Sequence, residues 1–135
     1  MFNHWSSTQH TIALSSGEAE LKGIVKGAAD GLGLQSVGKD LSIHYDIHVY
    51  TDASAAMGMV ARKGIGRVRH VEASELWIQD AVKNKVLTVN KVKGEDNPAD
   101  ILTKYIDQGN IHQHCHGIRQ VPEFGRPDSA PATTT

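Results

Sequence analysis

The fold class follows from residues 47–57, Ile47-His48-Val49-Tyr50-Thr51-Asp52-Ala53-Ser54-Ala55-Ala56-Met57. The first six residues alternate in polarity and are rich in β-branched and aromatic side chains, which predicts a strand. The Ala- and Ser-rich residues that follow favour a helix. The stretch therefore predicts a strand that passes directly into a helix, with Asp52 at the carboxyl end of the strand.

The segments on both sides continue this alternation. Upstream, apolar residues recur at three- and four-residue steps and predict an amphipathic helix with its apolar face formed by Leu21, Ile24, Val25, Ala28 and Leu32. Downstream, the pattern predicts a Gly-punctuated loop over 64–70, a helix over 71–84, a strand over 86–92 and a short helix over 97–104. Strands alternating with helices predict an α/β layered fold.

The start of the first helix carries two different glutamates. Ser15 and Glu18 have the spacing of a capping box, in which a hydroxyl and a carboxylate accept hydrogen bonds from backbone N–H groups, so Glu18 has a structural role. Glu20 shares its helix row with Gly23, Gly27 and Gly31, which permit close packing of the backbone. We therefore expect Glu20 to point along a buried or cleft-facing side.

Composition excludes several classes of protein. The 135 residues, 39% hydrophobic and 21% charged, allow one globular domain, and a net charge of −1 gives no global field for a polyanion. The single cysteine, Cys115, cannot form an internal disulfide. We see no signal peptide and no apolar run of the ~20 residues needed to span a bilayer. These features predict an intracellular, non-secreted protein, cytoplasmic or nuclear, without membrane contact.

Three acidic residues occupy positions where α/β folds place function. Glu20 lies in the first helix, Asp52 ends a strand, and Asp100 lies in the first turn of the last helix. Taken singly, Asp52 could cap the next helix and Asp100 could complement a helix dipole, each stabilising by roughly 0.3–2 kcal/mol. Taken together, they fit carboxylates that converge on divalent metal ions for phosphodiester hydrolysis.

The motifs around these residues resemble those of the ribonuclease H domains of copia-type retrotransposons. The matching stretches are Trp5-Ser6-Ser7-Thr8-Gln9, Ala13-Leu14-Ser15-Ser16-Gly17-Glu18-Ala19-Glu20-Leu21, Tyr50-Thr51-Asp52-Ala53-Ser54-Ala55-Ala56, Val68-Arg69-His70-Val71-Glu72 and Asn97-Pro98-Ala99-Asp100-Ile101-Leu102-Thr103-Lys104. They cover roughly residues 4 to 106 in the family's order. The resemblance implies the ribonuclease H-like domain of a Pol polyprotein, located by family in the retrotransposon particle.

By this resemblance, Glu20, Asp52 and Asp100 correspond to three of four catalytic, metal-binding carboxylates that hold Mg²⁺ or Mn²⁺. The substrate implied is an RNA/DNA hybrid, whose RNA strand is hydrolysed, and the implied partner is the reverse transcriptase portion of the same polyprotein. The family's fourth carboxylate lies upstream of the element matched by Trp5. We therefore expect an amino-terminally truncated ribonuclease H-like domain over 1–108, a mixed sheet flanked by helices without its first two strands, and an irregular or disordered tail over 109–135.

Basic residues concentrate in the loop after the second helix, at Arg62, Lys63, Arg67, Arg69 and His70. By composition alone this loop is a solvated surface. By the resemblance, Arg67, Arg69 and His70 are expected to contact nucleic-acid phosphates, and Arg and Lys would position the backbone without reading its sequence.

Three hypotheses of function remain open. The first is a metal-dependent ribonuclease H, and the second is a catalytically inactive fragment or nucleic-acid-binding remnant, because one carboxylate is missing. The third is a metal-binding protein built on His112-Gln113-His114-Cys115-His116, although neighbouring ligands cannot easily surround one tetrahedral zinc ion. The sequence favours inactivity of the isolated chain over catalysis.

Overall fold

The computed structural model describes residues 9, 12–64, 66, 75–102 and 104–119. Contacts between Cα atoms divide the chain into two units, one over Ser7–Asn97 and the other containing Pro98 and the residues after it. This division falls before the boundary at residue 108 that the sequence predicts. The expected contribution of Trp5 and the tail beyond residue 119 lie outside the described residues.

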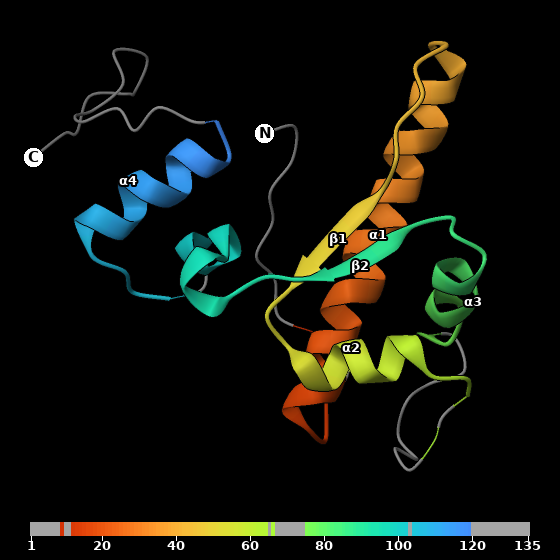
Figure 1. Cartoon of the computed structure of the whole chain (residues 1–135), viewed down its shortest axis with the longest axis horizontal. Coiled ribbons are helices and arrows are strands. Elements are labelled where there is room, and N and C mark those ends of the chain that lie inside the picture. The colour runs from red at the N-terminus through yellow and green to blue at the C-terminus, as the bar shows by residue number, and fades with distance from the viewer. Residues whose placement is uncertain (1–8, 10–11, 65, 67–74, 103, 120–135) are drawn as a thin grey trace, which may run out of the picture. The chain divides into compact units, whose positions relative to one another are not determined.

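The first unit is a mixed α/β structure built around two parallel strands (Figure 1). β1 (His48–Thr51) pairs with β2 (Thr88–Lys91), and the register places Val49 opposite Val89 and Thr51 opposite Lys91. Among the described residues the sheet contains no third strand, so both outer edges are unpaired there. The α/β class is confirmed, and both strands are shorter than the predicted spans 47–52 and 86–92.

The first unit also contains three α-helices. α1 (Ser16–Asp40) contacts β1 and α2 (Ser54–Ala61), while α2 also contacts β2 and α3 (Trp77–Lys83). The chain thus leaves β1, passes through α2 and α3, and returns in parallel as β2 (Figure 1). Parallel strands need a crossover connection of this kind, because the end of one strand and the start of the next lie at opposite ends of the strand pair.

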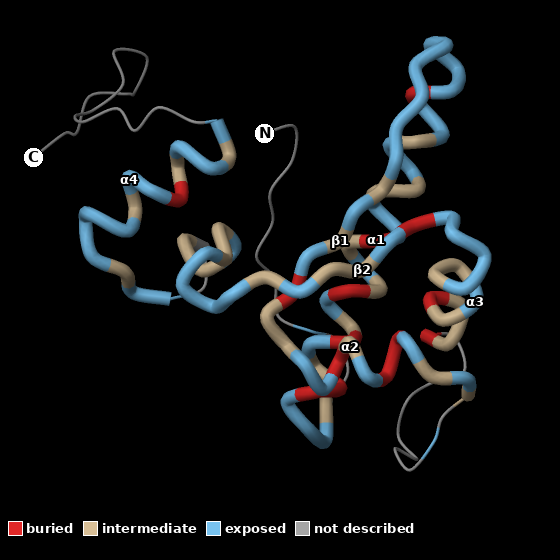
Figure 2. The backbone as a smooth tube through the Cα atoms, in the orientation of Figure 1, coloured by how far each residue is buried: buried red, intermediate tan, exposed pale blue. Residues whose placement is uncertain are grey.

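A small hydrophobic core lies where these helices meet the strands (Figure 2). Its buried members come from all three helices and from the residue before β2: Leu21, Ile24, Ala28, Ala56, Met59, Val60, Ile78 and Leu87. Trp77 packs against this core. Leu21, Ile24 and Ala28 of the predicted apolar face of α1 are therefore confirmed as buried, because helical periodicity places them on one side of the helix.

The start of α1 confirms the predicted capping box, except that the Glu18 carboxylate accepts from Leu14 N, one residue before the N-cap. Ser15 is the N-cap and its Oγ accepts a hydrogen bond from Glu18 N at 3.2 Å. The Glu18 carboxylate, only 2% exposed, accepts from Leu14 N at 3.0 Å and forms an ion pair with Lys22 at 3.3 Å. The helix extends to Asp40, beyond the apolar row that ends at Leu32, because the returning segment lies against its last turns, where Gln35 Nε2 donates to Tyr45 O.

The second unit contains a 3-10 helix, η3 (Pro98–Leu102), and α4 (Gln108–Gly117), which contact each other. The predicted short helix over 97–104 is therefore a 3-10 helix of five residues. The prediction of an irregular segment from residue 109 is wrong for α4, which begins because Asp107 Oδ1 accepts a hydrogen bond from Asn110 N at 2.8 Å. In neither unit is a described helix both long and apolar enough to cross a lipid bilayer.

Candidate functional site

Asp52 lies at the carboxyl end of β1, as the sequence predicts, in the bend that leads into α2. Thr51, which is buried, fixes this bend: its Oγ1 accepts from Ala53 N at 3.2 Å, and its main-chain oxygen accepts from Val92 N at 2.9 Å. Lys91 Nζ donates to the main-chain oxygen of Asp52 at 3.1 Å and also to Ser54 Oγ. The backbone around Asp52 is thus held from β2.

The half-buried carboxylate of Asp52 faces the turn that follows β2. This turn is η2 (Gly94–Asp96), and a Cβ placed on Gly94 would lie 3.7 Å from Asp52 Oδ2. The backbone of Gly94 therefore lies close to this carboxylate oxygen.

Glu20 lies in the second turn of α1, and α1 packs against α2, the helix that follows Asp52. Gly17 allows this approach, because a Cβ there would lie 3.1 Å from both Ala55 Cβ and Met59 Cε. Gly17 precedes Glu20 by three residues, and Ala55 follows Asp52 by three residues. The packing of α1 on α2 therefore brings the segments of Glu20 and Asp52 into one region of the first unit.

The prediction that Glu20 points along a buried or cleft-facing side is wrong, because Glu20 is exposed. The glycine row that motivated the prediction does not pack as a row: a Cβ at Gly23 or Gly27 would have nothing within 4 Å. Within that row, Gly31 alone approaches a neighbour, since a Cβ there would lie 3.1 Å from Ile47 Cγ2. The close approach to α2 is made instead by Gly17, which lies outside the expected row.

Asp100 belongs to the second unit, so its surroundings are described within that unit. It lies in η3 with little of its side chain exposed, and its Oδ2 forms an ion pair with Lys104 Nζ at 2.9 Å. The main-chain oxygen of Asp100 also accepts from Lys104 N at 2.8 Å. From the sequence, Asp100 could be a dipole partner or a metal ligand, and the ion pair with Lys104 is a third interaction.

The described residues do not complete a metal site. In the parts of the chain that the structure describes, no three His, Cys, Asp or Glu side chains lie close enough together to hold one ion. Within the first unit, the structure brings the segments of Glu20 and Asp52 into one region.

The predicted nucleic-acid contacts Arg67, Arg69 and His70 lie outside the described residues, but the start of their loop is described. Gly64 and Gly66 have φ angles of +78° and +62°, which L-residues with side chains rarely adopt. Gln79, on α3, holds this loop: its Oε1 accepts from Gly64 N at 2.7 Å, and its Nε2 donates to Met59 O at 2.8 Å and Gly64 O at 3.1 Å.

Sequence reasoning missed Gln79 and Lys91. Each makes its contacts with residues far away in the chain, and neither stands in a recognisable motif. One signal in the sequence was available for Lys91, because it lies near the end of the predicted strand over 86–92. A parallel pairing of these strands would have placed Lys91 beside the Asp52 bend.

The histidine cluster lies on α4. His114 is buried, at 6% exposure, whereas His112 and His116 are exposed and Cys115 is a half-buried free thiol. Helical geometry therefore directs adjacent residues of this cluster to different sides of the helix. This is the obstacle to a zinc site that their adjacency in the sequence predicts.

Comparison with known proteins finds a distant, partial similarity to a retrotransposon polyprotein. The chain is 29% identical over 108 residues to the retrovirus-related Pol polyprotein from transposon TNT 1-94 of Nicotiana tabacum, a copia-type element. The match covers 78% of this chain and 8% of that relative, so the chain spans a small part of the relative's length. No family model and no solved structure matches the chain. The chain is thus related to a retrotransposon Pol polyprotein.

Proposed function

We propose that this chain is the ribonuclease H-like domain of a copia-type Pol polyprotein, whose activity is the hydrolysis of the RNA strand of an RNA/DNA hybrid. Its partners would be the hybrid and the reverse transcriptase portion of the polyprotein. Glu20, Asp52 and Asp100 would be its catalytic carboxylates and would bind Mg²⁺ or Mn²⁺. Arg67, Arg69 and His70 would contact phosphates.

One observation carries the proposal. Asp52 ends a strand that has a parallel neighbour, and the helix after it packs against the first turn of the helix that bears Glu20. Functional side chains of α/β proteins gather at the carboxyl ends of parallel strands, where loops are free to present them. The similarity to a Pol polyprotein supports the same assignment. The order of the motifs along the chain resembles that of the ribonuclease H part.

The test is cleavage of a labelled RNA/DNA hybrid by the full chain in Mg²⁺ or Mn²⁺. Asp52→Asn keeps the shape of the side chain and removes the charge, and Asp46→Asn makes the same change at an exposed position in the segment before β1. If the proposal holds, cleavage requires the metal ion, Asp52→Asn abolishes it and Asp46→Asn retains it. Cleavage that survives Asp52→Asn would contradict the assignment of this residue.

A second candidate function is binding of the hybrid without catalysis. It is favoured by the exposed side chain of Glu20 and by the ion pair that already joins Asp100 Oδ2 to Lys104 Nζ at 2.9 Å. This candidate predicts that the folded chain retains the hybrid in a mobility-shift assay and leaves its RNA strand intact in either metal. The same pair of assays therefore separates the two candidates.

A further inference from the structure

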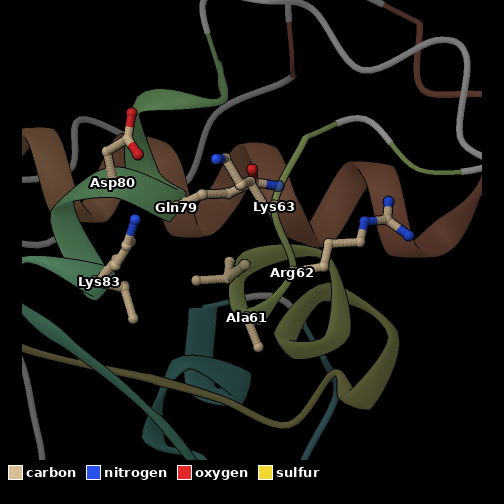
Figure 3. A pocket seen from close by; sticks show the side chains of 8 residues that line it. Ala61, Arg62, Lys63, Gln79, Asp80 and Lys83 are labelled. Carbon is tan, nitrogen blue, oxygen red and sulfur yellow. The ribbon is translucent and has the colours of Figure 1, made fainter.

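A pocket of about 260 Å³ lies between the carboxyl end of α2 and the exposed side of α3 (Figure 3). Its apolar floor includes Val60, Ala61 and Val82, and its polar groups include Lys63 from the loop and Lys83 from α3. The two lysines are twenty residues apart in the sequence. The packing of α2 against α3 brings them to one opening.

The ammonium groups of both lysines are available to a ligand. Both side chains are exposed, and neither forms a hydrogen bond or ion pair within the described ranges of the chain. Arg62 also lines the pocket, but Figure 3 shows its guanidinium turned away from the two lysines. That group lies beside Gly66, where a Cβ would be 2.9 Å from Arg62 Cζ.

The remaining polar groups determine the charge of the pocket. Gln79 uses its amide group on Gly64 and Met59, so it shapes the pocket and does not need a ligand. Asp80 contributes one carboxylate to the lining, against the two ammonium groups. The pocket therefore has a net positive charge, and its lysines are compact, mobile cations of the kind that bind phosphate without directional demands.

We propose that this pocket binds a backbone phosphate of a nucleic acid through Lys63 and Lys83, and that Asp80 weakens the contact. The choice of an RNA/DNA hybrid as the nucleic acid rests on the proposed function. The positive charge of the pocket and the hydrogen bonds of Gln79 that shape it do not depend on that function. Since the lysines contact phosphate alone, the pocket contributes affinity that is independent of base sequence.

The experiment measures binding of a short labelled RNA/DNA hybrid to the full chain, without divalent metal, at a series of salt concentrations. Lys63→Met with Lys83→Met removes both charges, and the matched control, Lys26→Met with Lys39→Met, removes two charges from α1. Loss of this one phosphate contact should reduce the slope of log K against log salt by about 0.9. The affinity ratio between the unchanged chain and this variant should then shrink about threefold between about 50 and 200 mM salt.

Asp80→Asn tests the same pocket with the opposite sign, because it removes the opposing carboxylate and should strengthen binding. An unchanged slope in the Lys63→Met, Lys83→Met variant, or an equal loss in the control, would overturn the inference, as would no binding by the unchanged chain. Binding that depends on these lysines, without any cleavage in metal, would support the pocket and contradict the proposed catalysis. Cleavage in metal without a contribution of these lysines to binding would support the proposed catalysis and contradict the pocket.

Discussion

Lys91 Nζ donates a hydrogen bond to the main-chain oxygen of Asp52, 3.1 Å away, and joins the end of β2 to the bend after β1. Its second bond, to Ser54 Oγ, reaches the first residue of α2. One side chain thus connects the two parallel strands to the helix that follows the proposed catalytic residue. The position of Asp52 depends on this connection and on the buried Thr51 beside it.

Replacement of Lys91 by Met should loosen this bend. Two exposed hydrogen bonds are lost while the aliphatic stem is kept, so we expect the free energy of unfolding to fall by about 0.5–1 kcal/mol. Hydrogen exchange of the first amides of α2 should accelerate in parallel. Lys93→Met is the matched control, and an equal effect of both changes would mean that charge, and not the contacts of Lys91, is responsible.

Replacement of Gln79 by Ala should release the loop that begins at Arg62. Three hydrogen bonds of a half-buried amide disappear, which should lower the free energy of unfolding by about 1–3 kcal/mol in urea denaturation. Gln35→Ala is the control, because Gln35 makes one exposed hydrogen bond, to Tyr45 O at 2.8 Å. The expectation fails if Gln35→Ala costs as much as Gln79→Ala.

Two glycine substitutions in α1 should have opposite effects. Gly17→Ala places a methyl group 3.1 Å from Ala55 Cβ, on a helix that cannot move without disturbing the core, and should destabilise by about 1–3 kcal/mol. Gly23→Ala meets nothing within 4 Å and should stabilise by about 0.5–1 kcal/mol through helix propensity. Thermal unfolding followed by circular dichroism measures both, and the same sign for both would contradict the packing of α1 on α2.

Glu18 should contribute to stability through its cap and not through catalysis. Glu18→Ala removes the acceptor for Leu14 N and the partner of Lys22, which should cost about 1–2 kcal/mol. Glu18→Gln keeps an acceptor oxygen and should cost less than Glu18→Ala. Binding of the hybrid by folded Glu18→Gln should match that of the unchanged chain, and a selective loss of binding would instead give Glu18 a functional role.

The local elements were predictable because their signals are local. The Ser15–Glu18 spacing predicted the start of α1, and the alternation over 47–52 predicted β1, since capping and side-chain periodicity depend on a few neighbouring residues. The continuation of α1 to Asp40 was not predictable from its apolar row. It depends on the returning segment, where Tyr45 packs so close to Gly38 that a Cβ there would lie 2.5 Å from the ring.

The sequence by itself determined the α/β class, the placement of Asp52 at a strand end and the order of the candidate carboxylates. The tertiary structure alone decided that Gly17 and not the Gly23 row makes the close approach, that Glu20 is exposed, and that Lys63 and Lys83 line one pocket. These relationships join segments far apart in the chain. They depend on how the helices pack around a common core, and no short-range pattern of residues encodes that arrangement.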